Sequence, residues 1–306
     1  MKRKDILGIS GLTKSEVNEI LSTANVMRDM IDSGQKGNSL RGKNVTTLFY
    51  ENSTRTRNSF ETAAKNLGAS TTSVSVAVSS VQKGESLVDT GKTLDALKTD
   101  VIIIRHSVAG SCHLLAQTVK ASVINAGDGM NEHPSQALLD GLTAVRYFGN
   151  VAGKKVVIVG DIKHSRVARS DVRLFGMLGA KVTVCAPYSL LPCGIDSLGC
   201  DVDTDFDRAI GGANILIPLR VQKERMVGAY FSSQEEYHEF YGVTQKRLSL
   251  CSDDCIVMHP GPINRGSEIS GDVADGDNSF ILEQVTNGVA VRMAMLDLLV
   301  NGEDRL

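Results

Sequence analysis

The sequence predicts an α/β protein made of two open parallel-sheet domains. Short apolar segments rich in Val and Ile alternate along the chain with segments whose apolar residues recur at helical spacing, and this alternation is typical of βαβ units. The chain has 306 residues, more than a usual single domain, which favours two domains. The alternation also starts again after Gly149, in the segment GNVAGKK.

The first half is expected to begin with a helix. Thr13 and Glu16 have the spacing of a capping box, and the helix that they open ends near Gly34. Pro134 has the place of a proline in a first helical turn, and its helix runs to Gly149. The elements expected between these two helices are a strand at 45–50, a helix at 54–67, a Ser/Val-rich stretch at 70–80, a helix at 86–98, a strand at 101–104, a short helix and a strand at 122–125.

The second half repeats this order and ends in an apolar helix. The terminal segment 280–302 has a helical period, and we expect it to pack back on the N-terminal domain. The predicted domains are therefore 1–149, completed by the helix at 286–306, and 150–285. The elements expected in the second domain are strands at 155–160, 181–185, 214–219 and 255–258, and a helix at 165–178.

The composition disfavours several classes of function. The net charge is −2, so the chain lacks the broad basic surface of nucleic-acid-binding proteins. No run of 18 apolar residues occurs, and the N-terminal MKRKDILGIS has no apolar stretch typical of a signal peptide, so we expect a cytoplasmic protein that does not bind membranes. The six cysteines include no C-x-x-C pair, which predicts reduced thiols and no structural zinc.

Polar residues follow the predicted strands directly. In open α/β sheets, ligands lie outside the carboxyl ends of the strands, so these residues are candidates for a site. Three of six strand ends carry an arginine in or next to the following turn, and no dense carboxylate cluster accompanies them. One arginine in such a place more often forms a surface ion pair, but the repetition in both halves predicts a site for a small polyanion.

The segment Ser53-Thr54-Arg55-Thr56-Arg57 lies at a strand-to-helix turn. The free N–H groups and the positive end of a helix favour an anion there. Successive helical residues are about 100° apart, so Arg55 and Arg57 cannot both face one anion. We assign Arg55 to the ligand and Arg57 to an internal partner. The alternative is a capped helix with two solvated arginines.

The sequence offers little support for a bound cofactor or metal. The segment after KVVIVG contains only Gly160 in place of G-x-G-x-x-G, which disfavours nicotinamide and flavin. No G-x-x-x-x-G-K-[ST] or G-x-S-x-G motif occurs. His133 and His259 do not have metal-ligand spacing with another His, Cys or acidic residue. We therefore expect no cofactor and no metal.

Five motifs together resemble the aspartate/ornithine transcarbamylase family, and they follow the family's order and spacing from about residue 5 to residue 300. RVQKER and HPGP, which stands in place of the His-Cys-Leu-Pro of ornithine enzymes, point to the aspartate members. Gly261 departs from the Leu or Ala that relatives often carry. The motifs are STRTR at 53–57, HPSQ at 133–136, DIKHSRVARS at 161–170, RVQKER at 220–225 and HPGPINRG at 259–266.

The resemblance implies an aspartate carbamoyltransferase: transfer of the carbamoyl group of carbamoyl phosphate to the amine of L-aspartate, an early step of de novo pyrimidine biosynthesis. The products are N-carbamoyl-L-aspartate and phosphate. The resemblance also implies a homotrimer with shared active sites, and a regulatory chain or a dihydroorotase would be a separate protein. Two alternatives stay open: a transcarbamylase that uses ornithine or another amine, and a non-catalytic scaffold for an enzyme of the same pathway.

The resemblance further implies roles for individual residues. Arg55, Thr56, Arg105 and His133 would be catalytic. Glu51 and Arg225 would serve domain closure, with Glu51 pairing with Arg166 and Arg225. Lys83 would come from a neighbouring subunit. The implied carbamoyl phosphate site comprises Ser53, Thr54, Arg55, Thr56, Arg105, His133, Gln136, Gly261 and Pro262, and the implied aspartate site comprises Lys83, Arg166, Arg220 and Gln222.

Overall fold

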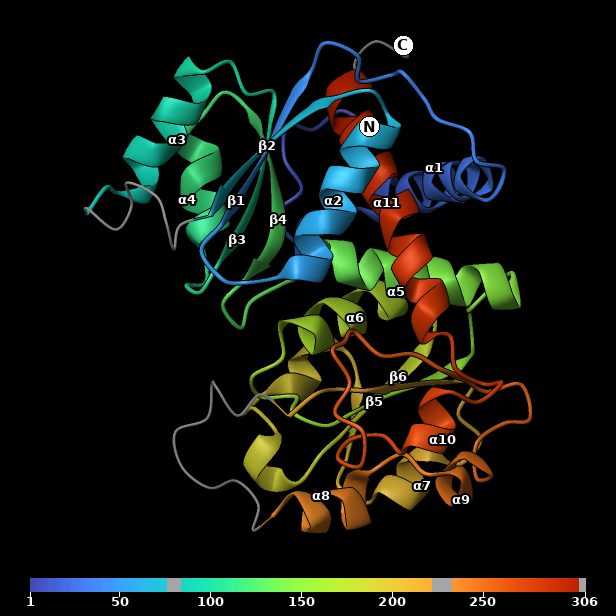
Figure 1. The fold of residues 1–306 in the computed structure, drawn as a ribbon. Helices are drawn as coiled ribbons and strands as arrows, with labels where there is room; N and C mark the ends of the chain where they lie inside the picture. The colour runs from blue at the N-terminus through green and yellow to red at the C-terminus, as the bar shows by residue number, and fades with distance from the viewer. Residues whose placement is uncertain (76–83, 222–232, 303–306) are drawn as a thin grey trace. The chain divides into compact units, whose positions relative to one another are not determined.

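The computed structural model describes residues 1–75, 84–221 and 233–302, which form two compact units (Figure 1). Unit 1 comprises Met1–Leu142 and Thr286–Leu306, and unit 2 comprises Thr143–Val285. The chain passes between the units within two helices, α5 (Pro134–Phe148) and α11 (Ile281–Asn301). The boundary expected at residue 149 is the end of α5, whereas the contacts of this helix change from one unit to the other after Leu142.

Unit 1 is a four-stranded parallel sheet with the strand order β2-β1-β3-β4. Figure 1 shows α3 and α4 on one face of this sheet and α2 and α11 on the other. The strand residues Leu48, Ile102 and Ile104 pack with α3 and α4 in one buried cluster. The elements are α1 (Lys14–Asp32), β1 (Asn44–Phe49), α2 (Thr54–Asn66), β2 (Ser70–Ser75), α3 (Leu87–Ala96), β3 (Val101–His106), α4 (Ser111–Thr118) and β4 (Ser122–Asp128).

Unit 2 is a five-stranded parallel sheet with the strand order β7-β6-β5-β8-β9. Alternate residues of β5 enter two different cores, Val156 and Ile158 on one face and Val157 and Val159 on the other, as expected for a strand buried on both faces. The elements are β5 (Lys155–Val159), α6 (Arg166–Met177), β6 (Lys181–Cys185), β7 (Asp201–Asp203), α7 (Phe206–Ile210), β8 (Ile215–Pro218), α8 (Gln234–Tyr241), α9 (Gln245–Leu248), β9 (Ile256–Val257) and α10 (Gly271–Ala274).

The structure confirms the fold class predicted from the sequence, including the return of the terminal helix to unit 1. The predicted strands and long helices occur with ends that differ by a few residues. The short elements β7 and α7 to α10 were not predicted. Strand β7 in particular is exposed and has the sequence Asp-Val-Asp, so it carries no apolar alternation that could indicate it.

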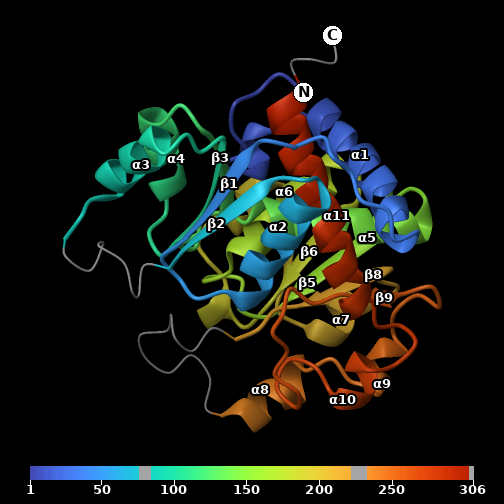
Figure 2. The same ribbon diagram turned by 45° about the horizontal axis from the view of Figure 1, so that its top comes forward.

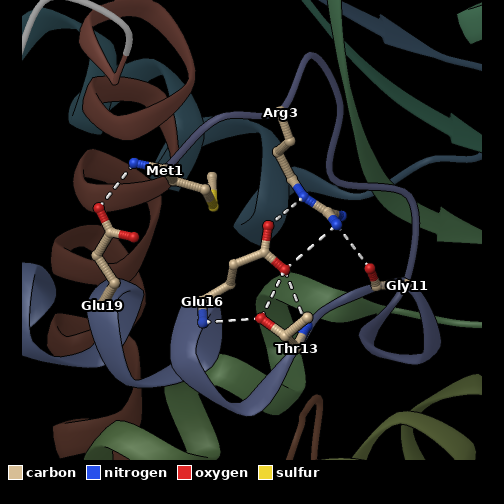
Figure 3. A network of polar contacts seen from close by, with 6 residues as sticks. All are labelled: Met1, Arg3, Gly11, Thr13, Glu16 and Glu19. Carbon is tan, nitrogen blue, oxygen red and sulfur yellow. Dashed lines mark hydrogen bonds and ion pairs between the residues drawn. The ribbon is translucent and has the colours of Figure 1, made fainter. Parts of the chain in front are cut away.

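The N-terminal segment is held by the capping box predicted at the start of α1. The Thr13 hydroxyl accepts from the Glu16 N–H, and the Glu16 carboxylate accepts from the Thr13 N–H at 2.8 Å. Arg3 joins this network through Glu16 and the Gly11 carbonyl (Figure 3). Burial alone would raise the pKa of Glu16, but the hydrogen bonds from Thr13 and Arg3 outweigh it and lower that pKa.

A buried carboxylate, Glu132, ties the N-terminal segment to the loop that leads into α5. Its oxygens accept from the N–H of Ile9 at 2.6 Å and from the hydroxyl of Ser10 at 2.6 Å. A Cβ on Gly8 would lie 2.6 Å from the same carboxylate, so the segment approaches Glu132 as closely as only glycine allows. Because Glu132 directly precedes His133, this anchor fixes one end of the candidate site.

We predict that Glu132→Ala lowers the thermal midpoint of unfolding more than Thr13→Ala does. The first change leaves the buried N–H of Ile9 without its acceptor, and each such loss costs about 1–3 kcal/mol. The second removes an exposed N-cap, which costs about 1 kcal/mol. Scanning calorimetry of both variants measures the difference, with Glu132→Gln as the matched variant that keeps an acceptor oxygen. A larger shift for Thr13→Ala would contradict the anchoring role.

Candidate active site

The first turn of α2 presents backbone N–H groups at the carboxyl end of β1. In the described part of the chain, the side chain of the N-cap residue Ser53 accepts no hydrogen bond from this turn. The N–H groups and the positive end of the helix therefore suit an anion. Thr54 is exposed and Thr56 is buried, so the hydroxyl groups of this turn lie at different depths.

The two arginines of this turn have different surroundings. The Arg57 guanidinium carbon lies 5.9 Å from the centroid of the Phe49 ring, within the range of a cation–π interaction. Arg55 is solvent-accessible, and the adjacent protein lowers its pKa by desolvation. Arg57 thus has an internal aromatic partner, while the sequence prediction that Arg55 contacts the ligand stays a prediction.

Arg105 is the penultimate residue of β3, next to β1 in the sheet. Its Nε lies 3.3 Å from Glu51 Oε2, and its Nη1 donates to the Ala126 carbonyl at 3.3 Å. Glu51, which the resemblance assigns to domain closure, therefore has a partner within unit 1. Parallel strands β1, β3 and β4 are neighbours, so Arg105, the start of α2 and the loop after β4 occur at the same edge of the sheet.

His133 and Gln136 are buried at the start of α5. The Gln136 amide nitrogen donates to both carboxylate oxygens of Asp140, at 3.1 and 3.3 Å. The Ser135 hydroxyl lies 3.5 Å from His133 Nδ1. Asp140 and Ser135 were not among the residues predicted from the sequence, although an aspartate inside the apolar run 137–142 was an available signal.

His106, beside Arg105, is a further residue that the sequence analysis did not assign to the site. Its ring lies 4.5 Å from the Tyr50 ring, and its Nδ1 accepts from the Val108 N–H at 2.9 Å. Burial lowers the pKa of His106, although the carboxylates of Glu51 and Asp128 oppose this shift. The ring is thus held neutral and packed beside the strand end that carries Arg105.

In unit 2, arginines lie at two strand-end positions predicted from the sequence. Arg166 is buried in the first turn of α6, whose N-cap Ser165 accepts from the Ala168 N–H at 3.1 Å. Arg220 lies two residues after the end of β8 and is half-buried. Gln222 and Arg225 of unit 2, like Lys83, lie outside the described residues.

The HPGP segment of unit 2 is fixed by His259. Its Nδ1 accepts from the Gly261 N–H at 2.7 Å, so its Nε2 carries the proton and faces Glu268 Oε1 at 3.2 Å. Gly261 has a φ of 66°, and Pro262 follows a cis peptide bond. Glycine adopts this left-handed conformation without steric cost, which gives a physical reason for the departure from Leu or Ala at this position.

Two further findings concern metals and membranes. Within residues 1–75, 84–221 and 233–302, no three or more His, Cys, Asp or Glu side chains gather as a metal site would require. No helix in the same ranges combines the length and the apolar composition needed to span a bilayer.

Sequence comparisons match both halves of the chain to one family. Residues 4–146 match the carbamoyl-P binding domain of aspartate/ornithine carbamoyltransferase, and residues 152–299 match its Asp/Orn binding domain. The chain is 53% identical over 300 residues to the aspartate carbamoyltransferase catalytic subunit of Acetivibrio thermocellus, which covers 98% of this chain and 96% of the relative. The corresponding subunit of Ruminiclostridium cellulolyticum is 52% identical, with the same coverage of both chains.

Solved structures of both branches of the family resemble this chain. Aspartate transcarbamoylase from Trypanosoma cruzi, solved with carbamoyl aspartate and phosphate, has a TM-score of 0.85 and 31% identity over 96% of this chain and 94% of that one. Ornithine carbamoyltransferase from Thermus thermophilus has a TM-score of 0.87 and 26% identity over 98% and 99%. Both family domains and relatives of more than 50% identity thus lead to one conclusion: the chain belongs to the aspartate/ornithine carbamoyltransferase family.

Proposed function

We propose that this chain transfers the carbamoyl group of carbamoyl phosphate to the amine of L-aspartate, as in the first reactions of pyrimidine biosynthesis. The observation that carries the proposal is the edge of the unit 1 sheet, where the first turn of α2, Arg105 and His133 lie at or after the carboxyl ends of three neighbouring strands. Relatives of about 50% identity are aspartate carbamoyltransferase catalytic subunits, and the similar Trypanosoma cruzi enzyme was solved with carbamoyl phosphate and aspartate.

The residues of unit 1 suit the carbamoyl donor. The N–H groups of α2, the hydroxyls of Ser53 and Thr54, and Arg55 hold the phosphate, since an anion is stabilised at a helix N-terminus. Thr56, Arg105 and His133 donate to the carbonyl oxygen. The Gln136 amide nitrogen is bound to Asp140, which directs its oxygen to the carbamoyl NH2.

The chemistry then needs positioning and charge stabilisation. The aspartate amine attacks the carbamoyl carbon, a C–N bond forms, and negative charge develops on the carbonyl oxygen, where preorganised donors stabilise it. The C–O bond to phosphate breaks, and the leaving phosphate takes the proton of the amine. The reaction proceeds with no metal or cofactor.

Unit 2 supplies the acceptor site. Arg166 and Arg220 bind the two carboxylates of aspartate, because a planar guanidinium forms two parallel hydrogen bonds to a carboxylate. Gln222, two residues after Arg220 in the sequence, joins them, and Gly261 and Pro262 contact the carbamoyl group. Glu51 pairs with Arg105 within unit 1. On domain closure, Glu51 would exchange this partner for Arg166 and Arg225.

We also propose a cytoplasmic homotrimer whose neighbouring subunits share active sites, with Lys83 of one chain reaching the substrates of the next. None of the six cysteines, all within the described residues, forms a disulfide, which supports a reducing compartment. A regulatory chain or a dihydroorotase would be a separate partner. Ornithine remains the alternative acceptor, because the fold resembles an ornithine enzyme as closely as an aspartate enzyme.

The acceptor is tested by product formation from carbamoyl phosphate with aspartate, ornithine and other amines. We predict carbamoyl aspartate as the product, and a strong loss of aspartate use in Arg220→Ala with carbamoyl phosphate binding retained. Removing one partner of a desolvated charge pair costs about 2–5 kcal/mol. Calorimetric titration with carbamoyl phosphate is the control. Citrulline as the main product would establish the ornithine alternative, and a protein without turnover on any amine would establish the scaffold.

Substitutions of the two arginines of α2 should have different effects, one on activity and one on stability. We predict that Arg55→Ala abolishes useful turnover, because the phosphate loses its principal charge partner. Arg57→Ala should instead lower the thermal midpoint, because it removes the guanidinium that packs on Phe49. Cation–π interactions are worth about 0.5–1 kcal/mol at exposed sites and about 2 kcal/mol when desolvated. Steady-state kinetics and scanning calorimetry on both variants test this division of roles. Equal catalytic losses in folded protein would show this division of roles to be wrong.

Shared sites are tested by complementation between two inactive variants. Trimers of Lys83→Ala and trimers of Arg55→Ala should each have almost no activity. Dissociating and reassembling them together should restore activity, because some interfaces then combine a wild-type loop with a wild-type phosphate site. If Lys83 acted in its own chain, every subunit of the mixture would carry one defect in its site. Mixed trimers without recovered activity would therefore contradict shared sites.

A further inference from the structure

A single arginine, Arg292, is buried in the apolar helix α11. It is the one charged residue between Glu283 and Asp297, and it is 4% exposed. Burial lowers its pKa to about 10, and the carboxylate of Asp140 opposes that shift, so the guanidinium stays charged near neutral pH. A buried charge of this kind is costly unless it has partners, and its partners identify what it does.

The structure makes room for this guanidinium at the expense of helix propensity. Gly288, one turn earlier in α11, would bring a Cβ within 2.5 Å of Arg292 Nη1 and 3.1 Å of Leu139 Cδ2. A glycine inside a helix costs roughly 1 kcal/mol relative to alanine. α11 therefore has glycine, a poor helix former, at the position that the side chain of Arg292 passes.

The guanidinium links the two helices whose first turns form the candidate site in unit 1. Arg292 Nη1 donates to the hydroxyl of Ser59 in α2 at 3.1 Å, and Nη2 donates to the hydroxyl of Ser135 in α5 at 3.4 Å. The ring of Phe60 in α2 lies 5.0 Å from the guanidinium carbon. Figures 1 and 2 both show α11 running beside α2. Ser59 is one turn beyond Arg55, and Ser135 is two residues beyond His133.

The direction of the hydrogen bonds around Ser135 follows from donor and acceptor chemistry. An arginine only donates, so the Ser135 oxygen is the acceptor from Arg292. The Ser135 side chain is fully buried, so its own O–H needs an acceptor, and His133 Nδ1 lies 3.5 Å away. Donation from a charged group also makes that O–H a stronger donor. His133 Nδ1 is then the acceptor, and the proton of the neutral ring sits on Nε2.

We propose that Arg292 is a positioning residue that acts through Ser135 to hold His133 in the Nε2–H tautomer, so that the ring donates to the carbonyl oxygen of the bound donor. This proposal deepens the proposed role of His133 and rests on it. The two distances at Ser135 are long for hydrogen bonds, and such bonds shorten when an active site binds its ligand. The Asp140 carboxylate has two roles near the start of α5: it orients Gln136, and it stabilises the charge of Arg292.

The test compares two serines that receive hydrogen bonds from the same guanidinium. Ser135→Ala removes the link to His133, whereas the matched control Ser59→Ala removes a hydroxyl of the same kind in α2. The full chain, labelled with 15N-histidine, contains six histidines, and His133→Gln identifies the His133 signals. The 15N shifts of the two ring nitrogens report the tautomer directly.

We expect the Nε2–H tautomer in the wild type and in Ser59→Ala, and a mixture of tautomers in Ser135→Ala. Loss of one hydrogen bond corresponds to a kcat roughly three- to tenfold lower in Ser135→Ala, with the KM for aspartate little changed. Ser135→Thr keeps a hydroxyl and should restore both the shifts and kcat. Arg292→Met should shift the tautomers in the same direction as Ser135→Ala.

Two results would overturn the proposal: an Nδ1–H tautomer in the wild type, or His133 shifts that respond identically to Ser135→Ala and Ser59→Ala. The first is read from the wild type, with His133→Gln used only to assign the signals, and so does not depend on how Ser135→Ala folds. If His133 did not donate to the carbonyl oxygen as proposed, a different result would be observed. In that case His133→Gln would keep nearly normal turnover, while the tautomer of the wild type would still be measurable.

Discussion

The candidate site depends on one constraint: charges buried behind it must have partners. Glu132, Asp140 and Arg292 are all nearly inaccessible to water, and each binds groups from a different part of unit 1. A buried charge without partners would destabilise the fold by several kcal/mol, so the residues around it have little freedom to move. Glu132 fixes the loop before His133, and Arg292 fixes the turns of α2 and α5. The precision of the candidate site thus comes from buried side chains outside the proposed substrate contacts.

The parallel sheet adds a second constraint that acts on the backbone. Neighbouring strands β1, β3 and β4 deliver their carboxyl ends to one edge, so residues more than fifty positions apart in the sequence occur together. The backbone brings the arginines and histidine to that edge, and the buried charges set their orientation. This division explains why Thr54 and Arg55 in the first turn of α2 stay exposed, while Phe60, further along the same helix, is fully buried.

The features predicted from the sequence are those with local signals. The capping box of Thr13 and Glu16, the strand-to-helix turn at STRTR and the alternation of strands and helices all depend on residues close in the chain. The contacts that were not predicted join distant segments, such as Arg292 with Ser135, 157 residues apart. The aromatic partner of Arg57 was also missed, because a ring leaves no charge pattern in the sequence. A lone arginine within the apolar run 289–296, one turn after a glycine, was a signal of the Arg292 contacts, but it does not identify the partners.

The comparison with ornithine carbamoyltransferase shows that the fold alone does not determine the acceptor amine. A structure at 26% identity has the same fold over nearly the whole chain, so neither the sheets nor the helix order can distinguish the amine that accepts the carbamoyl group. The supports of the donor site lie in the core of unit 1, where a change of one member leaves a buried charge unmatched. Arg220 follows a strand end of unit 2 and is only half-buried, so its surroundings can vary without disturbing a core. On the proposed assignment of Arg220 to the acceptor, a family built this way can keep one carbamoyl donor and change its acceptor, because substitution around Arg220 disturbs less buried structure than substitution in the core of unit 1.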